Sequence, residues 1–202
     1  MSEVKASWAM PTVATLWIVA ALCFGLFSLL AGLVPAAGTS VLCAWLIAGS
    51  VGLFIAAVIE FAKGEIVLGT ITLVFAPLIA LGGGMSFVEI LKLAPLGPEA
   101  MGAGMAVSGW VWLAIGILFF LFLPAVAKVS WSLFIMMIEL GVGIIMISIG
   151  MLTGVPMGEG LMLIAGYLVM IFAVYVMYVG LVFLTNTVYQ APKLSIGGPI
   201  IK

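Results

Sequence analysis

Six stretches of this chain are apolar over the length that a helix needs to cross a lipid bilayer. A hydrocarbon core of ~30 Å takes roughly 20 residues of helix. The six stretches lie at residues 15–34, 39–61, 66–87, 107–127, 131–152 and 161–184. Of the 202 residues 66% are hydrophobic and 6% are charged, too few polar side chains to cover a soluble domain. The sequence therefore predicts an all-α integral membrane protein in which residues 1–202 form one bundle of six transmembrane helices.

The third stretch is the least regular of the six. Pro77 lies inside it, and Gly82, Gly83 and Gly84 follow. Proline and glycine interrupt helices, so we expect a kink or a break there, with residues 85–93 lying along the far membrane interface. The longest polar connection, at residues 94–104, is too short for a soluble domain. The first stretch lacks a convincing cleavage site and is expected to remain as a span.

The lysines predict the orientation of the bundle. With six spans, five of them fall on the side of the termini, namely Lys5, Lys63, Lys128, Lys193 and Lys202. Only Lys92 falls on the opposite side. An excess of lysine marks the cytoplasmic side of a membrane. Both termini are therefore predicted to be cytoplasmic.

The motifs of soluble enzymes are absent from this chain. It has no histidine, arginine or aspartate, and no nucleotide-binding or metallohydrolase motif. No pair of acids accompanies a plausible nucleophile. Cys23 and Cys43 lie inside apolar runs without other ligands, as small buried hydrophobic side chains do. We predict that the chain is not an enzyme, needs no cofactor or metal, and binds no nucleic acid.

Few polar groups remain to carry function. The candidates in or next to the spans are Glu60, Thr70, Thr72, Glu139, Tyr175, Tyr178 and Asn186. This inventory is typical of a mostly apolar conduit with a few hydrogen-bonding stations for a small solute and protons. Glycines at helical spacing, such as Gly25 with Gly32 and Gly49 with Gly52, allow two interpretations. They let helices pack closely within or between subunits, or they leave room for a solute along a narrow pore wall.

Glu139 lies in the middle of the fifth stretch, in the sequence FIMMIELGVG. A carboxyl group at that depth in a membrane is costly and commonly functional. In one interpretation Glu139 lines the pore and takes up or releases a proton as the substrate passes. In the other it is neutral, faces a neighbouring helix and hydrogen-bonds a tyrosine, a threonine or a backbone carbonyl.

Several short motifs resemble one family. The run EFAKG at residues 60–64 closes the second span, with Thr70 soon after. It is similar to the E-Y-x-K-G turn of the acetate uptake transporters, the family of bacterial succinate–acetate permeases and their fungal relatives. Residues 166–167, Tyr178 and Asn186 resemble its G-W…Y…N pattern in the sixth span, and residues 149–150 also fit.

The resemblance implies a six-helix protomer with its own pore, assembled as a homo-hexamer in a prokaryotic plasma membrane and surrounded by lipid. Its substrates would be small monocarboxylates such as acetate, and also succinate, carried with protons. Family members narrow the pore with a Phe in the first helix, a Tyr in the third and a Leu in the fifth. The matching positions are Phe75 for the tyrosine and Leu140 for the leucine. The first-helix position falls near Val19, where Trp17 is expected to supply the missing bulk.

Two departures from the family pattern bear on the substrate. The N-P-A-P-L-G opening is reduced to Met10-Pro11, and Leu53 stands where some relatives carry Gln. An ionised Glu139 beside the constriction would also repel acetate by several kcal/mol, so acetate would pass with Glu139 protonated or as acetic acid. The alternatives are a channel for urea, short-chain amides or another small neutral solute, and a membrane assembly protein that transports nothing.

Overall fold

The computed structural model describes residues 11–201, so Lys5, Met10 and Lys202 lie outside the described residues. Every regular element in the described part is helical. The main helices are α1 Thr12–Leu30, α2 Thr39–Ala62, α3 Ile66–Val74, α4 Gly82–Leu93, α5 Pro98–Leu121, α6 Leu123–Val126, α7 Trp131–Thr153 and α8 Gly160–Tyr189. A π-helix, η2 Phe75–Leu81, joins α3 to α4, and two short 3-10 helices are η1 Ala36–Gly38 and η3 Ala94–Leu96. Residues 11–201 contain six helical segments long and apolar enough to cross a membrane, which confirms the predicted class.

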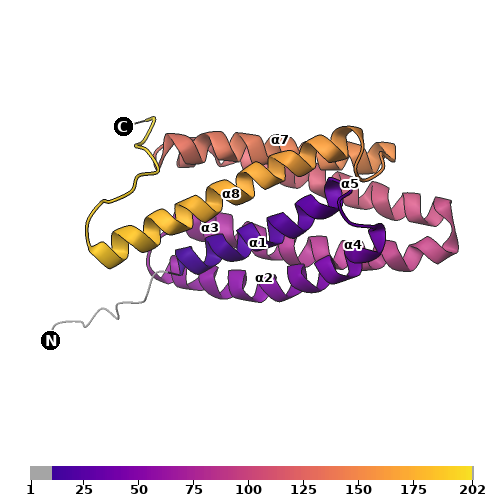
Figure 1. Cartoon of the computed structure of the whole chain (residues 1–202), viewed down its shortest axis with the longest axis horizontal. Coiled ribbons are helices and arrows are strands. Elements are labelled where there is room, and N and C mark those ends of the chain that lie inside the picture. Colours follow the sequence, from indigo (N-terminus) through magenta and orange to yellow (C-terminus); the bar gives the residue numbers. More distant parts are fainter. Residues whose placement is uncertain (1–10, 202) are drawn as a thin grey trace.

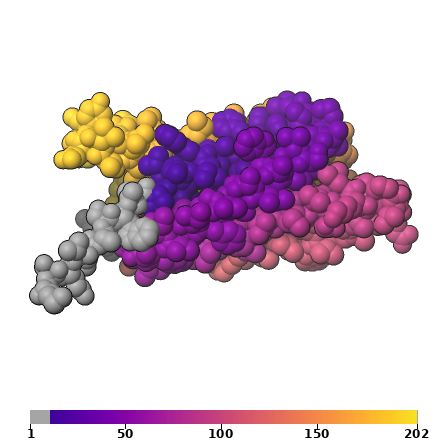
Figure 2. Space-filling model, turned by 90° about the horizontal axis from the view of Figure 1, so that it is seen from below, coloured from indigo at the N-terminus to yellow at the C-terminus, as the bar shows by residue number. Residues whose placement is uncertain are grey.

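The contacts between the six spans follow the order of the chain and close into a ring. The most extensive contacts join α1 to α8 and α5 to α7, while α2 packs on α1 and on the α3–α4 span. The contact of α4 with α5 and that of α7 with α8 complete the circle. Helix α1 begins and α8 ends at the same end of the bundle, which we call the terminal end (Figure 1). Figure 2 shows the side carried by α1 and α2, with α4 and α5 extending beyond them at one end.

The third span is irregular at Pro77, as predicted, but it does not break at the glycines. Helices α3 and α4 and the π-helix between them form one segment, Ile66–Leu96. Pro77 has no N–H to donate, and a π turn accommodates that loss inside a helix. A Cβ on Gly82 would stand 2.8 Å from the Pro77 carbonyl oxygen, so the turn needs glycine there. Residues 85–93 therefore continue the helix, and the expectation that they leave it for the interface is wrong.

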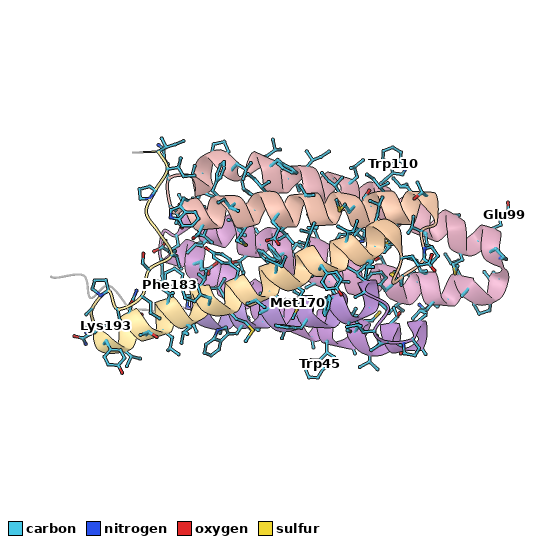
Figure 3. All side chains as sticks on the ribbon, turned by 45° about the horizontal axis from the view of Figure 1, so that its top comes forward. Trp45, Glu99, Trp110, Met170, Phe183 and Lys193 are labelled. Carbon is cyan, nitrogen blue, oxygen red and sulfur yellow. The ribbon has the colours of Figure 1, made fainter. Side chains whose placement is uncertain are left out.

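The predicted polar connection at residues 94–104 is also mostly helical. A 3-10 turn ends at Leu96, and α5 already begins at Pro98. Gly97 reverses the chain with a φ of +105°, which a residue with a Cβ rarely adopts. Proline favours the first position of a helix because its missing N–H would be unpaired there anyway. As a result α4 and α5 extend together to the tip marked by Glu99 (Figure 3).

The glycines serve close helix packing. In α1 and α2, a Cβ on Gly25 would stand 2.8 Å from Leu42, and one on Gly52 would stand 2.8 Å from Ile18. Between α5 and α7, a Cβ on Gly116 would meet Ile145 and lie 3.3 Å from a backbone oxygen. Lipid tails are as apolar as the helices, so close contact through small residues is what holds spans together.

A pair of glycines in α5 tests this packing. Gly116→Ala should lower the stability of the bundle by about 1–3 kcal/mol, because the new methyl group pushes α5 from α7. Gly102→Ala in the same helix has open space around its Cβ and should raise stability by up to ~1 kcal/mol through better helix propensity. The measurement is the melting temperature of the detergent-solubilised protein. Equal shifts for both variants would contradict close packing at Gly116.

Candidate functional site

A cavity lies inside the ring at the terminal end. Its volume is about 70 Å³, enough for several water molecules at roughly 10–15 Å³ each. Its walls come from α1, α2, α3, α7 and α8, and from Val126 and Val129 at the connection between α6 and α7. Most of the lining is apolar, so the few polar groups in it decide which solutes it can hold. We call it the terminal cavity.

A second, smaller cavity of about 20 Å³ lies farther along the bundle. Its lining comes from α1, α2 and the π-helix, and includes Leu22 and Leu53. The two cavities have two lining residues in common, Val19 and Phe75. These side chains therefore separate the two spaces. Both are buried, with 7% and 6% of their surface exposed.

Phe75 belongs to a cluster of aromatic rings. Its ring lies parallel to that of Phe172 from α8, with centroids 6.3 Å apart and planes 10° apart. It meets the ring of Phe119 from α5 edge-on at 5.4 Å. Phe172 also lines the terminal cavity. Neither Phe119 nor Phe172 is singled out by the sequence, because aromatic residues at helical spacing in a span look like ordinary core.

The polar groups of the terminal cavity gather around Glu60. Its side chain is 1% exposed. Thr12 donates a hydrogen bond to Glu60 Oε1 at 3.4 Å, while Glu60 Oε2 has no partner within residues 11–201. Thr15 and Thr72 are buried and line the same space. Two of the predicted polar residues, Glu60 and Thr72, thus line the same cavity as the predicted constriction residues Val19 and Phe75.

Local hydrogen bonds explain why Glu60 points inward. Glu60 is in the last turn of α2, and its backbone carbonyl accepts the N–H groups of Lys63 and Glu65 at 3.1 and 2.9 Å. Gly64 completes the turn with a φ of +81°. The charged side chains of Lys63 and Glu65 are exposed, so the turn sends two charges outward and leaves one carboxyl group inside.

Glu139 lies elsewhere. One face of α7 carries Ser132, Glu139 and Gly143, because residues seven or four apart lie on the same face of a helix. That face points toward α8, since Ser132 Oγ and Tyr175 OH are 2.6 Å apart and a Cβ on Gly143 would stand 3.3 Å from Leu168. Glu139 lines neither the terminal cavity nor the second one. Its two carboxyl oxygens are buried and have no hydrogen-bond partner within residues 11–201.

The remaining predicted residues lie outside both cavities. Leu140 is buried in the core. Trp17 is 43% exposed, and its Nε1 donates to the Met177 carbonyl at 3.4 Å on the outer side of α1 and α8. Thr70 donates to the carbonyl of Ile66 within its own helix at 2.7 Å.

Tyr178 and Asn186 both bind the segment that follows α8. Tyr178 OH donates to the Ser195 carbonyl at 2.9 Å. Asn186 Nδ2 donates to the Leu194 carbonyl at 2.9 Å, and its Oδ1 accepts the N–H groups of Lys193 and Leu194. The structure thus joins these two side chains to residues 191–201 rather than to a cavity.

Comparison with known proteins gives a match to a solved structure that covers the whole fold. No protein-family profile matches the sequence, and no curated protein matches it. Among solved structures, the bacterial acetate channel SatP superposes with a TM-score of 0.76. The match covers 95% of this chain and 100% of that chain, with 19% sequence identity. The chain therefore has the fold that the resemblance to the acetate uptake transporters implies.

Proposed function

We propose that this chain is a membrane transport protein of the acetate uptake transporter family that carries small monocarboxylates such as acetate. The observation that carries the proposal is the arrangement of two cavities inside the ring, separated by Val19 and Phe75, in a bundle with the fold of SatP. The solute would enter the terminal cavity, pass these side chains and continue through the second cavity. The motifs at residues 60–64 and in the sixth span support the same function.

The apolar constriction favours an uncharged solute. A charge is expensive to bring into a dry, low-dielectric passage, and hydrophobic constrictions exclude ions by losing their water. Acetic acid crosses such a point more easily than acetate, so transport is linked to protons. Succinate would need two protons to become neutral, and we therefore expect acetate to be the better substrate.

Glu60 is the group that we propose to hold the proton. It is a buried carboxyl group in the wall of the terminal cavity, which Val19 and Phe75 also line, and its Oε2 has no hydrogen-bond partner within residues 11–201. A protonated Glu60 can donate a hydrogen bond to the carboxylate of a bound substrate. Thr12, which already hydrogen-bonds Glu60, and Thr72 add hydroxyl groups to the same wall. Glu139 has no such access, because it lines neither cavity.

The assembly and the orientation follow from the resemblance and from charge. We propose a homo-hexamer in the plasma membrane of a prokaryote, with lipid around the ring and both termini in the cytoplasm. The support for the orientation is that Lys63, Lys128 and Lys193 follow or precede spans at the terminal end, whereas Lys92 belongs to the opposite end. An excess of lysine marks the cytoplasmic side.

Flux in proteoliposomes tests the proposed function directly. The purified chain should accelerate uptake of radiolabelled acetate over protein-free liposomes, with succinate slower and ammonium unaffected. Preferential flux of urea would favour a channel for neutral solutes. No flux of any of these solutes through correctly folded protein would favour a non-transporting assembly protein.

Truncation of Phe75 tests the constriction. Phe75→Ala should relax size selectivity, so that butyrate enters several-fold faster relative to acetate, because the apolar bulk between the two cavities is lost. Phe87→Ala is the matched control, since Phe87 is equally buried in the same span but lines neither cavity. Each variant should lose about 3–5 kcal/mol of stability. Unchanged size selectivity in folded Phe75→Ala would show that Phe75 does not form the constriction.

The two buried acids provide a matched test of proton linkage. Glu60→Gln keeps the size of the side chain and removes its titration. Acetate exchange should persist in this variant, while accumulation driven by a pH gradient should collapse and the pH profile of uptake should flatten. Glu139→Gln should leave both unchanged. Loss of accumulation in Glu139→Gln alone would assign the proton to Glu139.

A further inference from the structure

The segment after α8 lies across the terminal end of the bundle. Helix α8 ends at Tyr189, Gln190 turns the chain with a φ of +49°, and residues 191–201 form no helix. They run from the end of α8, near Lys193, to the side of the bundle that holds α7 (Figures 1 and 3). Backbone groups of such an irregular segment must find partners outside it.

One set of partners is on α8 itself. Asn186 binds the backbone of residues 193 and 194 through three hydrogen bonds of 2.8 to 3.0 Å. Tyr178 donates to the carbonyl of Ser195. These side chains fix the first half of the segment against α8.

The other set of partners is at the connection between α6 and α7. The carbonyl of Ile196 accepts the hydroxyl groups of Ser130 and Ser132. The carbonyl of Gly198 accepts the N–H of Trp131 at 2.9 Å. The N–H groups of Ile200 and Ile201 donate to the carbonyl of Ala127 at 2.8 and 3.3 Å.

These contacts complete the start of α7. Ser130 is its N-cap and accepts the N–H of Ser132. The first N–H groups of a helix have no partner within the helix, and here the Trp131 N–H is taken by Gly198. Leu133 and Met137, in the first turns of α7, line the terminal cavity.

The same connection supplies part of the cavity wall. Val126 and Val129 line the terminal cavity, while Ala127 and Ser130, beside them in sequence, are bound by the C-terminal segment. Ala127 and Ser130 are almost fully buried, with 2% and 0% of their surface exposed. Each of the two wall residues, Val126 and Val129, is therefore adjacent in sequence to a residue that the C-terminal segment binds. Movement of the segment would reach both wall side chains through these neighbours.

We propose that residues 191–201 are a strap that holds the α6–α7 connection against the terminal cavity and restricts entry from that end. With the strap bound, Val126 and Val129 stay in the wall and α7 keeps its cap. With the strap released, the connection loosens and the cavity becomes accessible. This inference rests on the proposed function only for its effect on transport, because access to the cavity can be measured without any substrate.

Gly197 is the position where one added methyl group would strain the bound strap. Its φ is +82°, which residues with a Cβ rarely adopt, and a Cβ there would collide with the indole nitrogen of Trp131. Gly198 is the next residue, and a Cβ on it would meet nothing within 4 Å. Gly197→Ala and Gly198→Ala therefore add the same methyl group to the same segment, but only Gly197→Ala is expected to disturb it.

The test measures entry into the terminal cavity. Thr15→Cys places a thiol in the cavity wall, and a membrane-impermeant maleimide is applied from the side of the termini. Gly197→Ala should raise the labelling rate at least fivefold, whereas Gly198→Ala should match the parent. The same variants without Thr15→Cys give the background from the buried Cys23 and Cys43. In separate samples, a spin label on Pro199→Cys reports whether the strap has been released.

Two further measurements make the test decisive. Asn186→Ala releases the strap from its α8 side and should raise labelling as well, so the inference does not depend on the folding of Gly197→Ala alone. Acetate efflux toward the terminal side should rise in parallel with labelling. If the spin label at Pro199→Cys becomes mobile while the maleimide labelling rate of Thr15→Cys is unchanged, the segment does not restrict entry and the inference is wrong. Faster maleimide labelling of Thr15→Cys without acetate flux in any variant would support the strap but contradict the proposed transport function.

Discussion

The structure depends on the need of every backbone N–H and carbonyl inside a membrane to find a partner in the protein. Helices satisfy that need locally, so all six spans within residues 11–201 are helical, and a π turn accommodates Pro77 without ending its span. Once the backbone groups are hydrogen-bonded within helices, the fold is decided by how the helices pack against one another. Glycines at the contacts bring the helices close, and the pairing of α1 with α8 closes the ring.

Closure of the ring creates an interior that differs from both lipid and water. Val19, Phe75 and Phe172 come from three helices, yet the ring brings them together at the boundary of the terminal cavity. Glu60 lines the same cavity and accepts a hydrogen bond from Thr12. A carboxyl group next to an apolar passage is a suitable place to exchange a proton with an acid, because the proton removes the charge that the passage would exclude.

The terminal end combines the cavity with the end of the chain. Tyr178 and Asn186 match family motifs in the sixth span, but in this structure their partners are the backbone of residues 193–195. A polar residue near the end of a span can bind a solute or can bind a neighbouring segment, and both uses need the same donors and acceptors. The location of the partner decides between them, and that location is a property of the folded chain.

The sequence by itself determined the class of the protein and the number of spans, because hydrophobic length acts locally. It also named Glu60, Thr72, Val19 and Phe75 as candidate site residues, through the scarcity of polar residues and the resemblance of short motifs to one family. Only the tertiary structure decided which residues share a cavity. Glu139 and Leu140 are adjacent in sequence and line neither the terminal cavity nor the second cavity, whereas Phe75 and Phe172 are far apart in sequence and stack. The physical reason is that each helix presents residues all around its axis, and the packing of its neighbours selects the stripe that faces the interior.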